Sequence, residues 1–312
     1  MAQLAGVFGT SHSPALITPV PDWPALEPRV LRPPVSGLTD VRAAWDEHQA
    51  RFDRAMKQLR HAILAVEPDV LLIVGSDQGE NFGPRSAPVF ELFLGDRVEA
   101  SAADRRGEGP EQFRVSMPVA TGLGQDVLKH LCAAGFDVAH VSETSHEYGI
   151  GHAITWPLRF LDLLDSDVQL LPLVTNVWNL PNVPGVSRCV AFGQALRTAI
   201  DASDAPVRVA VLASGGLSHL VLDEDLDARV LAALRSDDIS TWRTIDDDEL
   251  HLAHEKYGLT VRLNGTSEIT DWIIADACAA APAEVIDYVP AYRTESGYGV
   301  GMCFARWDRP AG

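Results

Sequence analysis

Two histidines follow apolar runs in this chain, at positions where a buried sheet would expose them. His12 comes after the apolar run 4–8, which predicts a buried strand, and three prolines within 14–21 prevent a helix from starting directly after it. His219 closes the glycine-containing turn that follows a second apolar run, 207–213. Open α/β sheets carry their chemistry on the loops after the carboxyl ends of strands. We therefore expect both histidines to line one crevice.

Carboxylates and a further histidine also follow a predicted strand or precede a predicted helix. The apolar run 69–75 leads into the polar segment 77–82, Glu268 stands at the start of a predicted helix, and His152 lies in a loop before another. Two histidines and one carboxylate on separate loops are the ligands of a facial metal site with open positions, as in non-haem iron oxygenases. The alternative is that these are unrelated polar residues of separate loops.

The elements that must position these residues alternate along the chain. Helical spacing predicts helices, and apolar runs bounded by turn residues predict buried strands. We predict an α/β fold over residues 1–312, a single domain with a central, mostly parallel or mixed sheet flanked by helices. The predicted helices span 41–66, 125–134, 153–164, 186–200, 223–257 and 268–280, and the predicted strands span 4–8, 69–75, 89–94, 137–141, 168–174, 207–213, 285–288 and 300–305. Residues 101–112 are expected to form a loop, and His251 to lie on a solvated helix face.

Composition limits the partners of the protein. The 312 residues carry a formal net charge of −18, which repels phosphate backbones and anionic lipid, so we expect no nucleic-acid or membrane partner. The four cysteines are far apart and form no Cys-x-x-Cys pair, and the glycines form no dinucleotide or P-loop fingerprint, so no nucleotide cofactor is expected. Without a recognisable signal peptide or spanning segment, a cytoplasmic protein is expected.

Three segments resemble the signature segments of the class III extradiol ring-cleaving dioxygenases. They are residues 9–14 (GTSHSP), 214–219 (SGGLSH) and 263–268 (LNGTSE), in the order of that family, and residues 149–153 and 292–293 lie where the family has related segments. The resemblance implies cleavage of a catechol-like or aminophenol-like aromatic ring with O2 by non-haem Fe(II). It also makes a homo-oligomer, or an oligomer with a related subunit, the expected assembly.

The resemblance assigns roles to four of these residues. It implies that His12 is the first iron ligand, that Glu268 is the carboxylate ligand, that His219 is the acid/base residue, and that His152 orients substrate or oxygen. A neutral imidazole near pH 7 suits the removal of a proton from a catechol. Asp77, Glu80, Tyr148 and Tyr292 are the residues that we expect to contact the substrate.

The second ligand position departs from the family, because Gln78 stands where the family has a histidine. An amide oxygen coordinates iron(II) more weakly than an imidazole nitrogen. Alternatively, Glu80 is recruited as a ligand, and two carboxylates favour a harder ion such as Mn(II) or Mg(II). A third possibility is that no metal binds and that Gln78 and Glu80 hydrogen-bond a ligand or their own loop.

The altered ligand also leaves two other functions open. One is a family member that performs non-oxidative metal chemistry, such as a hydrolase or lyase step. The other is a non-catalytic subunit that pairs with an active paralogue. The presence of His12, His219 and Glu268 together favours an enzyme, since a subunit without activity has no need of all three.

Overall fold

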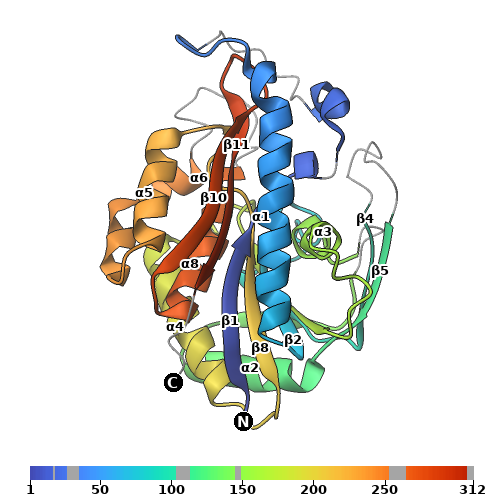
Figure 1. The fold of residues 1–312 in the computed structure, drawn as a ribbon. Helices are drawn as coiled ribbons and strands as arrows, with labels where there is room; N and C mark the ends of the chain where they lie inside the picture. Colours follow the sequence, from blue (N-terminus) through green and yellow to red (C-terminus); the bar gives the residue numbers. More distant parts are fainter. Residues whose placement is uncertain (17, 27–34, 103–112, 145–148, 253–264, 308–312) are drawn as a thin grey trace.

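The computed structural model describes residues 1–16, 18–26, 35–102, 113–144, 149–252 and 265–307, and Figure 1 shows how their helices surround a central sheet. Nine strands of this part of the chain form one sheet in the order β10-β11-β1-β8-β2-β7-β3-β6, with β9 paired to β11. They are β1 (Gln3–Thr10), β2 (Val70–Asp77), β3 (Phe90–Phe93), β6 (Val138–Val141), β7 (Gln169–Asn176), β8 (Arg208–Ser214), β9 (His219–Val221), β10 (Ala283–Tyr292) and β11 (Tyr298–Trp307).

The centre of the sheet is parallel and fixes where the site forms. Strands β1, β8, β2 and β7 are parallel neighbours, whereas β11 and β3 run antiparallel to this group. Thr10 is in register with Ser214, and Ser214 is in register with Gly75. The carboxyl ends of β1, β8 and β2 therefore meet at one edge, and the loops after them leave the sheet side by side.

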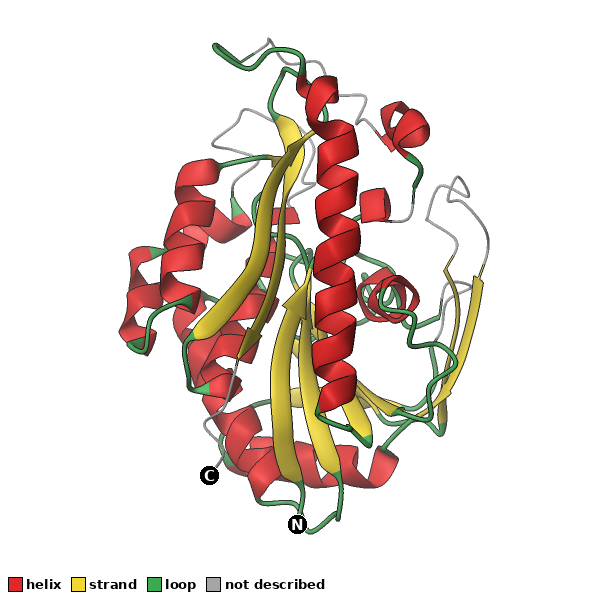
Figure 2. Cartoon of the chain, viewed as in Figure 1, coloured by secondary structure: helices red, strands yellow, loops and turns green. Residues whose placement is uncertain are grey.

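Helices cover both faces of the sheet, as Figure 2 shows. Alternate side chains of a strand point to opposite faces. Leu71 and Ile73 belong to one buried cluster, packed with α1 and α3, whereas Leu72 and Val74 belong to a second, packed with α2, α4, α5 and α8. The helices are α1 (Trp45–Ala65), α2 (Thr121–Ala133), α3 (His152–Phe160), α4 (Val186–Asp201), α5 (Glu224–Leu234), α6 (Asp247–His251) and α8 (Ile269–Ala279).

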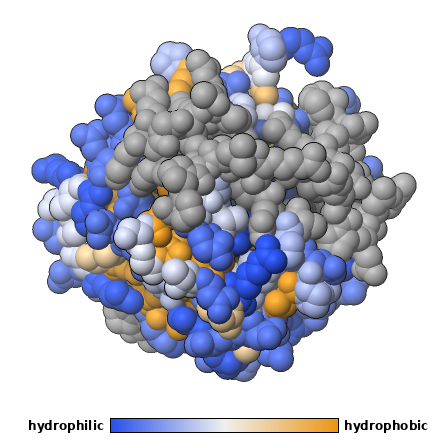
Figure 3. Space-filling model, turned by 90° about the horizontal axis from the view of Figure 1, so that it is seen from above, coloured by the Kyte–Doolittle hydropathy of each residue, from blue (hydrophilic) through white to orange (hydrophobic). Residues whose placement is uncertain are grey.

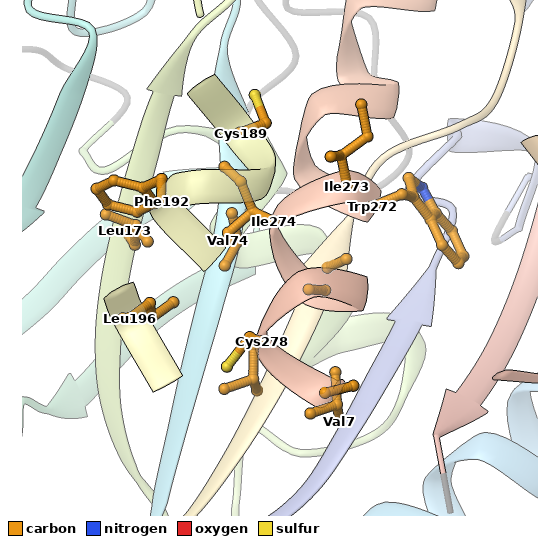
Figure 4. Packing of buried hydrophobic residues seen from close by; sticks show 14 of the residues in the cluster. Val7, Val74, Leu173, Cys189, Phe192, Leu196, Trp272, Ile273, Ile274 and Cys278 are labelled. Atoms are coloured by element: carbon orange, nitrogen blue, oxygen red, sulfur yellow. The ribbon is translucent and has the colours of Figure 1, made fainter. Parts of the chain in front are cut away.

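Helix α8 is buried along its whole length, and Figure 4 shows its side chains packed against α4 and the sheet. Three glycines elsewhere in the chain, in β1, in α4 and directly after β8, make room for it. A Cβ at Gly9 would lie 2.3 Å from the ring of Trp272, one at Gly193 would lie 2.3 Å from the carbonyl oxygen of Ile274, and one at Gly215 would lie 2.7 Å from the Cβ of Glu268. The helix that follows Glu268 is therefore fixed against β1, β8 and α4.

The predicted α/β fold with a mixed sheet and flanking helices is confirmed, and several local predictions are wrong. The predicted loop from residue 101 begins inside a strand, because β4 (Arg97–Ala102) pairs with β5 (Phe113–Pro118). The predicted helix 223–257 is interrupted after α5 and after the 3-10 turn Ile239–Thr244. His251 is buried, and its ring contacts Ser267 and the carbonyl of Pro184.

In the part of the chain that the structure describes, no helix has the length and apolar character needed to cross a membrane.

Candidate active site

Glu268 is the centre of the site at the carboxyl edge of the sheet. It ends the 3-10 turn Gly265–Glu268 that leads into α8, and its side chain is 1% exposed. Oε2 accepts a hydrogen bond from the backbone N–H of Gly216 at 2.8 Å. Oε1 lies 3.4 Å from His12 Nε2 and 3.3 Å from His219 Nε2. One carboxylate thus joins the loops after β1 and β8.

The ring of His12 is held in one tautomer by Ser214, at the end of β8. The Ser214 hydroxyl donates to the carbonyl of Ala153 at 2.5 Å, so its oxygen serves as an acceptor for His12 Nδ1 at 2.9 Å. A proton on Nδ1 leaves the lone pair of Nε2 directed toward Glu268 when the ring is neutral. His12 therefore presents a ligand atom to the carboxylate.

His219 is oriented in the same way by its own turn. Its Nδ1 lies 2.8 Å from the carbonyl oxygen of Leu217, and because a carbonyl only accepts, Nδ1 carries a proton. The exchangeable site is then Nε2, on the side of Glu268. Burial lowers the pKa of His219, but the charge of Glu268 and the hydrogen bond to it outweigh burial, so the pKa is raised.

His219 and His12 in turn change the pKa of Glu268. Burial alone would raise the pKa of Glu268, but His219 and His12 outweigh burial and hold the pKa well below its usual range. Glu268 is therefore ionised in the folded protein, and its negative charge is shared by two imidazoles.

The loop after β2 brings Gln78 to the same carboxylate. The amide of Gln78 donates to Glu268 Oε1. The preceding residue, Asp77, accepts hydrogen bonds from the backbone N–H groups of residues 79, 80, 81 and 82, so its carboxylate holds the loop in a tight turn. Gln78 is thus in contact with Glu268, whereas the Asp77 oxygens face the backbone of their own loop.

Glu80, from the same loop, pairs with His152 at the start of α3. Its Oε1 lies 2.7 Å from His152 Nδ1 and also accepts from the backbone N–H of His152 at 3.2 Å. Burial lowers the pKa of His152, but Glu80, and to a smaller extent Glu268 and Asp77, raise it to about 9. The ring is therefore an imidazolium at neutral pH, and it meets the ring of His12 edge-on with centroids 4.8 Å apart.

A comparison with protein families identifies the group to which this architecture belongs. Residues 6–301 match the family model described as the catalytic LigB subunit of aromatic ring-opening dioxygenase. The chain belongs to this family. The family resemblance expected from the sequence is thereby confirmed.

Individual members of the LigB family are similar to part of this chain at modest sequence identity. A 2,3-dihydroxyphenylpropionate/2,3-dihydroxicinnamic acid 1,2-dioxygenase of Comamonas testosteroni is 27% identical over 188 residues, 60% of this chain and 53% of the relative. A gallate dioxygenase of Pseudomonas putida is 34% identical over 104 residues, 33% of this chain and 29% of the relative. The chain spans about half the length of the curated dihydroxyphenylpropionate dioxygenases that it matches.

One solved structure is similar to this chain in its fold. The crystal structure of an uncharacterized protein from Escherichia coli K12 aligns with a TM-score of 0.52 and 13% sequence identity, and it covers 97% of this chain and 99% of that chain. The arrangement of strands and helices is therefore shared at low sequence identity.

Metal binding is common among LigB dioxygenases, and two donors here fit an ion. His12 Nε2 and the ionised Glu268 face each other at 3.4 Å, so a proton or a bound cation between them would be stabilised by both groups. Among the described residues, no three His, Cys, Asp or Glu side chains form a group that could hold a metal ion. Residues His12 and Glu268 would therefore hold an ion together with a weaker donor, and Gln78 is the nearest candidate by its contact with Glu268.

Of the two tyrosines predicted to contact the substrate, only Tyr292 belongs to the described residues. The hydroxyl of Tyr292 donates to Glu224 of α5 at 2.8 Å. Tyr148 lies outside the described residues. Seen from above, the described part of the surface is mainly hydrophilic, with hydrophobic residues gathered at a few places between (Figure 3).

Three residues that shape the site had no predicted role. Ser214 fixes the ring of His12, and Arg293 donates to Ser13 Oγ at 2.7 Å, beside His12. A Cβ at Gly265 would lie 1.9 Å from the ring of His219, so this glycine leaves space for the imidazole. Ser214 and Gly265 stand inside the motifs themselves, and Arg293 belongs to the segment 292–293 that lies where the family has a related segment.

Proposed function

We propose that this chain cleaves the ring of a catechol-like or aminophenol-like aromatic beside its two adjacent heteroatoms, using O2 and a bound Fe(II). The observation that carries the proposal is the convergence of His12 Nε2 and His219 Nε2 on one oxygen of Glu268. A facial site needs ligands on separate loops, here His12 and Glu268, with positions left open for substrate and oxygen, and His219 lies beside them as a proton acceptor. Membership of the LigB family supports the same reaction.

Each residue has a distinct part in the proposed reaction. His12, Glu268 and, more weakly, Gln78 would hold the ion, which when bound supplies a centre that binds the diol and activates oxygen. His219 accepts one diol proton at Nε2, since its Nδ1 proton is held by Leu217. Both atoms of O2 enter the product, and the ring opens at the bond beside the diol.

His152 acts as a fixed positive group in this proposal. Its Nδ1 proton is bound by Glu80, so Nε2–H remains as a donor toward a negative oxygen of the substrate or of oxygen on its way to the product. Because Glu80 is paired with His152, its role here is to orient His152 and not to bind the metal.

The proposal is tested with protein purified without oxygen and loaded with Fe(II). Catechol and 2-aminophenol are mixed with it in buffer containing ¹⁸O2, and oxygen uptake and product mass are measured. We expect one O2 consumed for each ring opened and both labelled atoms in the product. Turnover of neither compound by the Fe(II)- or Mn(II)-loaded protein, with full metal occupancy, would overturn the proposal.

Metal binding is tested separately by anaerobic titration of the His12→Ala variant. We expect one divalent ion per wild-type chain and none in the variant. The matched control is His61→Ala, because His61 is exposed on α1 and distant in sequence from every residue of the site. Unchanged stoichiometry in His12→Ala would remove His12 from the ligand set.

A further inference from the structure

The peptide unit between Leu217 and Ser218 is hydrogen-bonded to an ionisable side chain on each side. Its carbonyl oxygen accepts the Nδ1 proton of His219 at 2.8 Å, and its N–H donates to Oδ1 of Asp227 at 2.7 Å. This peptide is trans, so its carbonyl and its N–H point in opposite directions. A single rigid unit therefore connects the imidazole of His219 with a carboxyl group on α5.

The carboxyl group of Asp227 is held from several directions. Asp227 lies in the first turn of α5 and is fully buried. Its Oδ2 accepts a hydrogen bond from the hydroxyl of Tyr288, on β10, at 2.7 Å. A Cβ at Gly301 of β11 would lie 2.2 Å from the same oxygen, so this glycine makes room for Asp227. Helix α5 and the β10–β11 hairpin, side by side in Figure 1, thus enclose the group.

The same hairpin fixes the peptide unit. The N–H of Leu217 donates to the carbonyl of Gly301 at 2.9 Å, and the N–H of Gly301 donates to the carbonyl of Ser218 at 2.9 Å. Asp227 and the peptide are therefore fixed relative to one another by the same residue of β11.

The hydrogen bonds in this chain of groups strengthen one another. A carboxylate that accepts from a peptide N–H polarises the peptide and makes its carbonyl oxygen a better acceptor. Burial raises the pKa of Asp227 to about 7, against the lowering effect of the hydrogen bonds from Tyr288 and Ser218, so the group is a carboxylate above neutral pH. An aspartate bonded directly to a catalytic imidazole fixes its tautomer and stabilises the imidazolium that forms during turnover. A peptide between the two groups can transmit the same influence.

We propose that Asp227 is a positioning residue for His219 and acts through the Leu217–Ser218 peptide. It fixes the carbonyl that holds the Nδ1 proton, so that Nε2 stays free to accept a proton from the substrate, and it stabilises the imidazolium that results. The use of that proton rests on the proposed ring-cleaving function, whereas the chain from Asp227 to His219 is testable without it.

The chain of hydrogen bonds is tested by ¹⁵N and proton NMR of the metal-free and Zn(II)-loaded protein at pH 8. The Nδ1–H signal of His219 is assigned by its loss in His219→Ala. We expect a slowly exchanging, low-field proton in the wild-type protein and a signal at higher field in Asp227→Asn, because an amide is a neutral acceptor. In Asp227→Ala the signal should be lost by exchange with water.

The matched control is Asp276→Ala, because Asp276 is a buried carboxyl group of α8 that accepts two hydrogen bonds, from Trp242 and Trp307. The His219 signal should be unchanged in this control. Tyr288→Phe removes one hydrogen bond of Asp227 and should have an effect between wild type and Asp227→Ala, so it tests the inference even when Asp227→Ala does not fold.

Three results of the NMR experiment would overturn the inference. They are the absence of the signal in the wild-type protein, an unchanged signal in the Asp227 and Tyr288 variants, and an equal loss in Asp276→Ala. The last result would show that the signal reports a general loosening of the fold.

Turnover of catechol by the Fe(II)-loaded variants measures the consequence for the reaction. We expect kcat to fall about tenfold in Asp227→Asn and further in Asp227→Ala, with KM and metal content near the wild-type values, because only proton transfer is affected. Asp276→Ala should keep the wild-type kcat. Failure of the wild-type protein to cleave the ring would contradict the proposed function alone, and the NMR result would still decide the role of Asp227. An active wild-type protein with an unchanged kcat in Asp227→Ala would contradict that role.

Discussion

The two sides of the site meet at Glu268 and differ in where their positive charge comes from. The His12 side comprises His12, His219 and Ser214, and there two ring nitrogens face one carboxylate oxygen. The Gln78 side comprises Gln78, Glu80 and His152, and there a carboxylate and an imidazolium already pair at 2.7 Å. The His12 side therefore needs a proton or a metal ion, whereas the Gln78 side supplies its own counter-charge.

This difference in charge accounts for an amide at residue 78, where the family has a histidine. A histidine at residue 78 would add another imidazole beside Glu268, whose Oε1 already faces His12 and His219. An amide instead donates to Glu268 and carries no charge. Substitutions on the His12 side should therefore change catalysis or metal binding, whereas substitutions on the Gln78 side should mainly change stability or metal affinity.

The largest effect is expected for His219→Ala on the His12 side. Removal of the group that accepts the substrate proton should lower kcat by about 10²- to 10⁴-fold. Metal content, measured by anaerobic titration, should stay at the wild-type value, and His61→Ala serves as the control. Loss of metal together with activity would assign His219 to the ligand set.

The next effect concerns Glu91 of β3, whose pKa is influenced by Asp77, the residue before Gln78. Burial, reinforced by the charge of Asp77, raises the pKa of Glu91 to about 7. The folded state therefore binds this proton more tightly than the unfolded chain does. The resulting contribution to the free energy of unfolding is at most about 3 kcal/mol. It is complete below about pH 4.5 and is lost as the pH rises through about 7.

Replacing the acid should remove that pH dependence. Urea unfolding near pH 5 and near pH 8 should show a smaller difference for Glu91→Gln than for the wild-type protein. Glu99→Gln, at an exposed position on β4, is the control and should behave as wild type. An unchanged pH dependence in Glu91→Gln would mean that Glu91 ionises normally in the folded protein.

Glu80→Gln should separate a pairing role from a ligand role. The substitution replaces the carboxylate that binds the His152 imidazolium, so the free energy of unfolding should fall by about 2 kcal/mol. Metal affinity should change little, because the carboxylate of Glu80 pairs with the ring of His152. Release of the metal by this variant, with wild-type binding tight, would show that Glu80 is a ligand.

The smallest effect is expected for Gln78→His. Restoring an imidazole should tighten Fe(II) binding about tenfold, which is about 1.4 kcal/mol, because nitrogen is a better donor to iron than an amide oxygen. Anaerobic titrations of this variant and Glu80→Gln should be run side by side. Affinity that does not change in Gln78→His would argue that residue 78 does not touch the metal.

The sequence predicted the His12 side better than the Gln78 side, and for a physical reason. His12 and His219 follow parallel strands, and the carboxyl ends of such strands meet wherever the sheet forms. The pairing of Glu80 with His152 depends instead on a turn held by Asp77 and on Gly151 at a φ of +97°, where an added Cβ would lie 2.8 Å from Glu80 Oε2. Such a contact is set by loop geometry, which hydrophobic periodicity does not encode.

The same limit applies to the secondary structure. Long apolar strands such as β2 and β8 were predictable because burial on both faces requires continuous apolar residues. The three-residue strand β9 was not predicted, since its pairing with β11 is a tertiary contact. His251 has the spacing of a surface residue, yet hydrogen bonds to Ser267 and Pro184 satisfy both ring nitrogens inside the protein.

The glycines packed against α8 restrict how this protein can diverge. Gly9 lies in β1, Gly193 in α4 and Gly215 directly after β8, and each leaves less than 3 Å for a Cβ beside α8 or Glu268. A larger residue at one of them requires a smaller partner or a shifted helix, and a shift of α8 would move Glu268 away from both histidines. Among active descendants of this sequence, substitutions at these glycines should therefore occur together with changes in α8, whereas the exposed helix faces should vary one residue at a time.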